Sequence, residues 1–447
     1  MMLRTDSAGM RGKVDWLLIF AAVGLVLIGS VMILSAASPL LRYPQIVQRH
    51  VMALLLGGAA FLFGLGMHYQ VFQDQSRVLY ALTLAILVAV LVFGETVRGH
   101  RSWIRLPLFA FQPSEVTRIC MILVLANYLD RRHKQIERLG TLMGAIGVAV
   151  PIVTLLLLQP DFSSAALLFP VIIAMLFCTG GSLGHIASIT GCAGVAVALT
   201  LLESLSMLHP EWSQNSGTLQ FVGLLSRSNG WLAVAAAAVC ALTYLAYRAS
   251  LAMRFRYPPL YYWVTAGVLV SGLCAGIFIN RNIKEYQRNR FLVFLAPESD
   301  PQEAGYHVNQ ALVAIGSGGV TGKGIFSGTQ SQLGFLPERH TDFIFAVIGE
   351  EMGFLGAAAV LGLYLLLMGR IVHAARLSRD RYGFLVCTGL TAMFGAYFMV
   401  NVGMCLGVIP VAGIPLPLVS YGGSSLVASL WAVGIVANIY SKRYAFA

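Results

Sequence analysis

Two pairs of ionisable residues stand out in an otherwise apolar chain, because such groups are costly away from water. Glu115 and Arg118 are three residues apart shortly after Pro113, a spacing that places both on one face of a helix's first turn, where they could pair. A structural ion pair explains them as well as a role in binding a substrate. Glu350 and Glu351 lie in an apolar run, and a carboxylate there is by default a functional-site hypothesis.

Residues 280–340 form the longest stretch without the pattern of a membrane-spanning helix, and loops of roughly 60 residues are usually functional or disordered. Aromatic and aliphatic residues alternate here with the glycine-rich turns Gly316–Gly319 and Gly322–Gly324, which favours a packed loop. Glycine also lets backbone N–H groups approach a ligand closely. Directly after the loop, the run His340, Thr341 and Asp342 opens a helix that carries Glu350 and Glu351 about two turns further on.

Basic residues crowd into this loop, from Arg281 to Arg339, and into a shorter loop that contains Arg98, Arg101 and Arg105. Two such clusters indicate that something anionic is handled there. The alternative is that these side chains only touch lipid phosphates.

Composition identifies the elements that must position these residues. Of the 447 residues, 57% are hydrophobic and 11% are charged, whereas a soluble domain carries about 25% charged residues. Apolar runs recur along the whole chain, and a spanning helix needs about 20 apolar residues. We therefore expect an all-α integral membrane protein, one polytopic bundle over residues 1–447 with about twelve spans. We expect these spans near residues 25, 58, 86, 121, 150, 171, 193, 239, 269, 355, 395 and 432.

The distribution of charge predicts the orientation of the spans. With a cytoplasmic N-terminus, the arginines of loops 131–138, 248–256 and 370–381 all lie inside, together with both termini, as the positive-inside rule requires. The loop 280–340 is then external. The net charge of +11 is explained by topology and lipid contact, which argues against nucleic-acid binding. Seven cysteines in apolar segments give no disulfide framework or zinc site.

Four separated motifs resemble the SEDS family, whose members act in shape, elongation, division and sporulation. They are the runs Gln112–Glu115, Gln159–Asp161, Gly328–Phe345 and Ile414–Ser425. The details Gln330-Ser331-Gln332-Leu333 and Pro337-Glu338-Arg339-His340 are more similar to RodA, the elongation member, than to FtsW, the division member. The resemblance covers essentially the whole chain.

The resemblance implies an inverting peptidoglycan glycosyltransferase in the bacterial inner membrane, which polymerises lipid II during cell elongation with a class B penicillin-binding protein as transpeptidase. The family's catalytic carboxylate, an aspartate before proline in the large external loop, matches Asp300 in the run Pro297–Pro301. The substrate-binding residues that we expect on this basis are Arg101, Glu115, Arg118, Asp161, Lys323, Arg339, His340, Asp342, Ser420 and Gly422.

These residue types suit that reaction. An acceptor hydroxyl must attack an anomeric carbon while a lipid pyrophosphate leaves, and a carboxylate that takes the hydroxyl's proton typically contributes about 10²–10⁴-fold. A second, protonated carboxyl is not needed, because pyrophosphate leaves as a stable anion and mainly needs positive charge beside it. That charge could come from a divalent cation (magnesium or manganese) or from basic residues of the loop, which are Arg281, Lys284, Arg288, Arg290, Lys323 and Arg339.

Each of these residues also has a simpler explanation. Asp300 before Pro301 is a common turn pair, and the family resemblance is what favours catalysis. Asp161 is as well placed to cap a helix as to bind a substrate. Gly422 and Gly423 could serve only a tight turn.

The chain departs from the family pattern in several places. It has Ser102 directly before Trp103 where the family usually has arginine, Arg118 where it has lysine, and Phe162-Ser163 where it has Leu-Gly. The family's usual ten spans also imply that residues 205–257 are a two-helix insertion, which we expect to be peripheral to catalysis. The rival functions are a lipid II flippase and a scaffold without activity.

Overall fold

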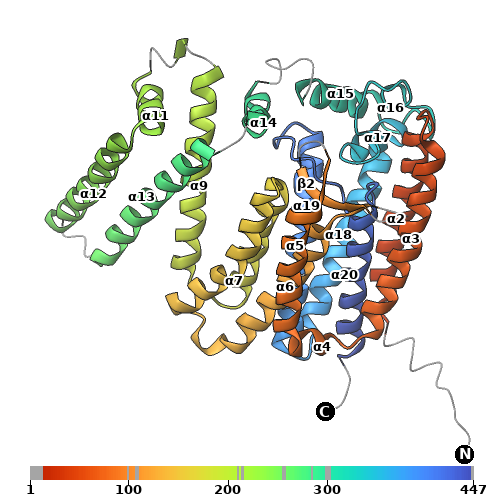
Figure 1. The fold of residues 1–447 in the computed structure, drawn as a ribbon, viewed down its shortest axis with the longest axis horizontal. Helices are drawn as coiled ribbons and strands as arrows, with labels where there is room; N and C mark the ends of the chain where they lie inside the picture. The colour runs from red at the N-terminus through yellow and green to blue at the C-terminus, as the bar shows by residue number, and fades with distance from the viewer. Residues whose placement is uncertain are drawn as a thin grey trace, which may run out of the picture. The chain divides into compact units, whose positions relative to one another are not determined.

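The computed structural model describes residues 14–97, 100–105, 110–208, 211–212, 216–253, 258–282, 285–296 and 304–443. The predicted membrane domain contains two compact units. Unit 1 comprises Met1–Gly181 with His307–Ala447, and unit 2 comprises Ser182–Tyr306. Helices dominate both units (Figure 1), and the predicted all-α polytopic fold is confirmed.

Unit 1 contains most of the helices and one small antiparallel sheet with strand order β1-β2-β3. Its N-terminal part consists of α2 Trp16–Ala37, α3 Tyr43–Gly66, α4 Tyr69–Asp74, α5 Ser76–Phe93, β1 Glu95–Val97, β2 His100–Arg105, β3 Ala110–Phe111, α6 Pro113–Arg131, η1 His133–Gln135, α7 Leu139–Leu158 and α8 Phe162–Cys178. Its C-terminal part consists of α15 Ala304–Ser317, which begins at the boundary with unit 2, α16 Thr329–Gln332, α17 Ile344–Glu351, α18 Gly353–Arg376, α19 Arg381–Cys405 and α20 Gly423–Ser441.

The long elements that the structure describes in unit 2 are all helices, namely α9 Leu183–Leu208, α11 Gly217–Arg227, α12 Asn229–Ala252, α13 Pro259–Asn282 and α14 Glu285–Leu295. Helix α13 packs along α9, and α11 and α12 complete a small core of Leu199, Val222, Leu225, Ala235 and Ile277. Glycines on α13 allow the close approach, since a Cβ on Gly272 would lie 2.6 Å from the Cβ of Val195 on α9.

All twelve predicted segments contain helix, but ten described helices, rather than twelve, are long and apolar enough to cross a membrane. The exceptions are α6, which carries the charged residues Glu115, Arg118, Asp130 and Arg131, and α8, which has 17 residues. Ten candidate spans make the chain a multi-pass membrane protein.

The span expected near residue 355 is in fact two helices. The first, α17, ends at Glu351, and α18 begins at Gly353. Gly353 has a φ of +65°, which favours glycine, and a Cβ there would collide with the backbone nitrogen of Gly322. The glycine-rich loop before α17 therefore packs against the junction of α17 and α18.

The proposed insertion, residues 205–257, contains α11 and α12, and of these only α12 is long enough to span. The next helix of that length, α13, begins just after the segment. The other helix in the described part of 205–257, α11, is apolar but has only 11 residues. The peripheral role of this segment stays a prediction.

Within unit 1, α18 packs between α2 and α19, α19 also contacts α6 and α8, and α20 packs along α3 (Figure 1). The α3–α20 contact depends on glycine. A Cβ on Gly64 of α3 would lie 2.9 Å from the carbonyl oxygen of Trp431, and one on Gly434 of α20 would collide with the carbonyl of Phe61. These two glycines let the backbones approach, as small residues do at membrane helix interfaces.

This crossing generates a stability prediction. We expect Gly434→Ala to lower the free energy of unfolding by about 1–3 kcal/mol, because the added methyl overpacks against a backbone carbonyl that cannot move aside. Gly58→Ala, on α3 where a Cβ meets nothing within 4 Å, should be neutral or stabilising by up to about 1 kcal/mol. Unfolding of both purified variants in detergent tests this, and equal effects would contradict the glycine crossing.

Candidate active site

The four motifs meet at one end of unit 1, called here the motif end: the end at which α2 finishes and α6, α8, α17 and α20 begin. Three contacts show this. The Nε2 of Gln112 lies 3.5 Å from Oδ2 of Asp161, the backbone N–H of Gln112 donates to Ser424, and that of Tyr421 donates to the carbonyl of His340. The motifs therefore form one structural assembly although they lie far apart in sequence.

Glu115 and Arg118 pair within this assembly, as their spacing predicted. Both are buried in the first turns of α6, and Nη1 of Arg118 lies 2.8 Å from Oε2 of Glu115. The Tyr397 hydroxyl donates to the same Glu115 oxygen at 3.2 Å, and Nη2 of Arg118 donates to the Ser164 hydroxyl at 2.6 Å. The position also suits the acid, since a helix N-terminus favours negative charge.

One polar atom of this pair is left over. The Nε of Arg118 is buried and has no hydrogen-bond partner within the described part of the chain. A buried guanidinium N–H without an acceptor is costly. It is thus a ready donor at the motif end, while the rest of the guanidinium is held by Glu115 and Ser164.

Asp161 caps α8, the simpler of its two expected roles. Its Oδ1 accepts the backbone N–H of Ser164 at 3.1 Å, and its Oδ2 lies 3.5 Å from Nε2 of Gln112. The loop with the basic cluster reaches the same place, because the Ser102 hydroxyl donates to the carbonyl of Gln159. The backbone of Arg101 lies in β2 opposite Thr96, and its side chain lies outside the described residues.

Glu350 is fully buried and accepts four hydrogen bonds, which fix the segment Lys323–Ser331. Its Oε1 accepts from Nζ of Lys323 (3.0 Å), Oγ1 of Thr329 (3.0 Å) and the backbone N–H of Gln330 (2.8 Å). Its Oε2 accepts the backbone N–H of Ser331 at 3.0 Å. Burial acts to raise the pKa of Glu350, but these hydrogen bonds and the lysine outweigh it, so the pKa lies below its usual value.

Glu351 does the same for the neighbouring elements. Its carboxylate accepts from the hydroxyls of Ser35 (2.6 Å to Oε2) and Ser331 (3.0 Å to Oε1) and from the backbone N–H of Phe326 (3.1 Å). Together the two glutamates tie α2, α16 and the loop before it to α17. We call them the carboxylate hub.

The glycine-rich turn wraps around the end of α17. The backbone N–H groups of Lys323 and Gly324 donate to the carbonyls of Glu350 and Glu351, both at 3.0 Å. Gly322 has a φ of +80°, and a Cβ there would collide with the Glu351 carbonyl. The glycines serve close backbone packing here, and the Lys323 charge is matched by Glu350.

Arg339 and Asp342 also make structural contacts. The buried Arg339 donates from Nε to the carbonyl of Ala36 at the end of α2, 2.8 Å away. The carbonyl of Asp342 accepts from Nδ2 of Asn401 on α19 at 2.9 Å, and the same Nδ2 donates to the carbonyl of Ile414. Asn401 and Tyr397 are four residues apart on α19 and so share one helix face. This face contacts both the segment around Asp342 and the Glu115–Arg118 pair.

The run Ile414–Ser425 forms the turn that enters α20. Ser420 accepts the backbone N–H of Leu416 at 2.7 Å, which closes the turn. Gly422 has a φ of −178°, an extended conformation open to any residue, so the tight turn does not require glycine at this position. The ring of Tyr421 lies 5.4 Å from that of His340.

Sequence reasoning missed several residues around Tyr421. The ring of His50 lies 6.4 Å away, and Arg49 hydrogen-bonds the Tyr421 hydroxyl. Burial raises the pKa of Tyr421, and Arg49 offsets only part of that rise. Both residues lie within the candidate span α3, so the rule that ionisable residues in spans are functional candidates would have identified them. Ser35 and Tyr397 carry no such signal in the sequence.

The predicted catalytic residue, Asp300, lies outside the described residues, as does Lys284. Among the residues that the structure does describe, no group of three or more His, Cys, Asp or Glu is placed to hold a metal ion. The described site thus consists of positioned carboxylates, hydroxyls and cations.

Comparison with known proteins gives a consistent result. A family model described as "Cell cycle protein", which covers FtsW, RodA and SpoVE, matches residues 14–231 and 232–445. The peptidoglycan glycosyltransferase RodA of Treponema pallidum is 34% identical over 96% of this chain and 98% of its own length. A probable peptidoglycan glycosyltransferase FtsW of Thiomicrospira cyclica is 31% identical over 98% of this chain and 94% of its own.

A solved structure is similar over nearly the whole length of the chain. It is described as "Structural coordination of polymerization and crosslinking by a peptidoglycan synthase complex", and one of its chains matches with a TM-score of 0.68 and 28% identity. The match covers 97% of this chain and 99% of that one.

The carboxylate hub generates a prediction with a defined pH dependence. We expect Glu350→Gln to lower the free energy of unfolding by roughly 2–4 kcal/mol, because it removes a buried charge that accepts four donors. Since the folded pKa of Glu350 is depressed, this difference should be fully present above the ordinary glutamate pKa of about 4.3 and shrink as the pH falls through the lower folded value. Unfolding midpoints measured across this pH range test it. Glu137→Gln, on an exposed residue, is the control, and an equal effect there would contradict the hub.

Proposed function

Because this chain belongs to the family of FtsW, RodA and SpoVE cell cycle proteins, we propose that it polymerises lipid II into glycan strands during cell elongation. It is a multi-pass membrane peptidoglycan glycosyltransferase. The elongation role is supported by the runs Gln330–Leu333 and Pro337–His340, which are more similar to RodA than to FtsW. Division is the alternative role within the same family.

The observation that carries the proposal is the convergence of four distant motifs at one end of unit 1. The charged side chains Glu115 and Asp161 of these motifs lie at that motif end, together with three charged residues that follow the motifs in sequence, Arg118, Glu350 and Glu351. A flippase would need functional carboxylates along a path across the bilayer. A concentration at one end suits a reaction performed at one membrane surface.

In the proposed reaction Asp300 is the general base. It takes the proton of the acceptor hydroxyl while that oxygen bonds to the anomeric carbon of the second sugar, and the bond to the lipid pyrophosphate breaks. The pyrophosphate leaves as an anion and needs positive charge nearby. Attack from the face opposite the leaving group inverts the anomeric centre.

The contacts that the proposed substrate ligands already make support a division of roles among them. Lys323, Asp161 and Ser420 are engaged in fixing the loop, the start of α8 and the turn before α20, so we propose that they position the site. Arg118 keeps an unpaired Nε–H, and we propose it, together with Arg49 beside Tyr421, as a contact for polar groups of the substrate.

The remaining proposed ligands are assigned by the family resemblance. They are Arg101, Glu115, Arg339, His340, Asp342 and Gly422.

We further propose a class B penicillin-binding protein as partner and the bacterial inner membrane as location, with both termini cytoplasmic. The similar solved structure is of a synthase complex that coordinates polymerization and crosslinking, which supports a crosslinking partner here. The arginines near the ends of α6 and α18 support the orientation.

The proposed topology predicts which loops a membrane-impermeant thiol reagent can reach. In a variant without native cysteines, a cysteine at position 303 should be labelled in intact cells, and one at position 134 only after the cells are opened. Labelling at 134 but not at 303 would reverse the orientation.

The proposed base predicts the effect of Asp300→Asn, which keeps the size of the side chain and removes the proton-accepting charge. Polymerisation of labelled lipid II by the purified protein, with and without its partner, should fall by a factor on the order of 10² or more, while lipid II binding persists. Glu298→Gln, two residues away, removes a like charge and should have little effect. Near-normal glycan synthesis by folded Asp300→Asn would move the assignment to another carboxylate, with Asp342 the next to test.

A further inference from the structure

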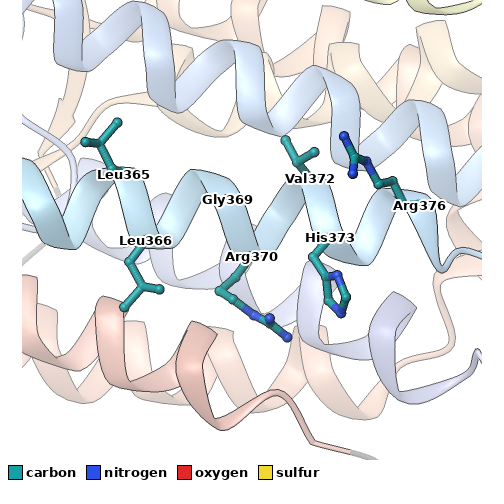
Figure 2. A pocket seen from close by; sticks show the side chains of 7 residues that line it. All are labelled: Leu365, Leu366, Gly369, Arg370, Val372, His373 and Arg376. Atoms are coloured by element: carbon teal, nitrogen blue, oxygen red, sulfur yellow. The ribbon is translucent and has the colours of Figure 1, made fainter.

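A hollow of about 470 Å³ lies on the surface of α18 near its C-terminal end (Figure 2). Gly369 forms its floor between two rows of side chains. One row is Leu365, Val372 and Arg376, and the other is Leu366, Arg370 and His373. A Cβ on Gly369 would meet nothing within 4 Å, so the floor is open.

The hollow is far from the motif end. Arg370 in its wall pairs with Asp15, which caps the start of α2, whereas the carbonyls of Ser35 and Ala36 at the other end of α2 accept from Gln332 and Arg339 of the motifs. A helix of 22 residues is about 33 Å long, close to the thickness of a bilayer's hydrocarbon core. The hollow therefore lies at the level of the opposite leaflet.

Its chemistry changes along the helix. Leu365 and Leu366, toward the middle of the span, supply apolar walls, while Arg370, His373 and Arg376 supply basic walls toward the helix end. The distance from Leu365 to Arg376 along the axis is about 16 Å. An apolar section below a basic rim has the same order as the acyl chains and phosphate of a phospholipid.

The basic rim carries more positive charge than the protein compensates. Arg370 is held by Asp15, with Nη2 2.8 Å from Oδ2. Arg376 is exposed and has no ion-pair partner within the described part of the chain. The ring of His373 lies 6.1 Å from that of Tyr440, and the guanidinium of Arg443 lies over the Tyr440 ring, 3.6 Å from its centroid. Basic pockets beside membrane helices suit anionic lipid headgroups.

We propose that this hollow binds the phosphate headgroup of an anionic phospholipid, with Arg376 as the principal contact and the acyl chains along Leu365 and Leu366. The site is separate from the glycosyltransferase machinery. A membrane helix of a partner could also seat on Gly369, but the basic rim favours an anion.

The test is native mass spectrometry of the delipidated, full-length protein titrated with phosphatidylglycerol or with phosphatidylcholine of the same chains. We expect preferential binding of phosphatidylglycerol. Arg376→Gln should weaken it about fivefold, and Arg381→Gln, on an exposed arginine outside the hollow, should not. If both variants weakened phosphatidylglycerol binding equally, the preference would come from general surface charge, and the proposed site would be wrong.

A second pair of variants tests the shape of the hollow without changing charge. Gly369→Leu should fill the floor and abolish preferential binding, whereas Gly362→Leu, on the same helix and also facing open space, should retain it. Unchanged lipid binding by Gly369→Leu would overturn the proposal. If that variant instead lost self-association or association with its partner while it still bound the lipid, the hollow would be a protein contact. Competition by glycerol phosphate as strong as that of the whole lipid would show a soluble anion site instead.

Discussion

The motif end depends on two adjacent carboxylates that are buried and fully used. Glu350 and Glu351 together accept donors from α2, the glycine-rich loop and α16. A buried carboxylate without partners would be too costly to keep ionised, so the chain must bring these donors to it. The same contacts also fix the loop, because its backbone N–H groups and the Lys323 side chain are held by the two carboxylates.

This constraint explains the glycines and the break between α17 and α18. For the loop to reach the carbonyls of Glu350 and Glu351, its backbone must lie against the helix end, and Gly322 and Gly353 provide the space and the positive φ. A continuous helix through residue 352 would close that place. We therefore relate the helix break to the buried charges: α17 ends at Glu351, the backbone of Gly322 packs against Gly353, and α18 begins there.

Apolar periodicity and length were enough to predict the helical membrane fold, and spacing alone predicted the Glu115–Arg118 pair. Other features depend on tertiary contacts that periodicity does not predict. Polar α6 is enclosed by other helices, and the break at Gly353 depends on a loop about 30 residues earlier. Glu350 illustrates the limit for sites: an acid in an apolar run suggested chemistry, but neighbours distant in sequence determine that its lone pairs are already occupied.

At the motif end, the hydrogen bonds that a polar side chain already makes distinguish a structural residue from a candidate for catalysis. A carboxylate such as Glu350, which accepts four hydrogen bonds and has a pKa below its usual value, is a weak base. A general base for a sugar hydroxyl needs a lone pair directed at the substrate. We therefore propose that the hub serves catalysis as a rigid frame and that the base is a carboxylate outside the hub, which is the role that the family resemblance gives to Asp300.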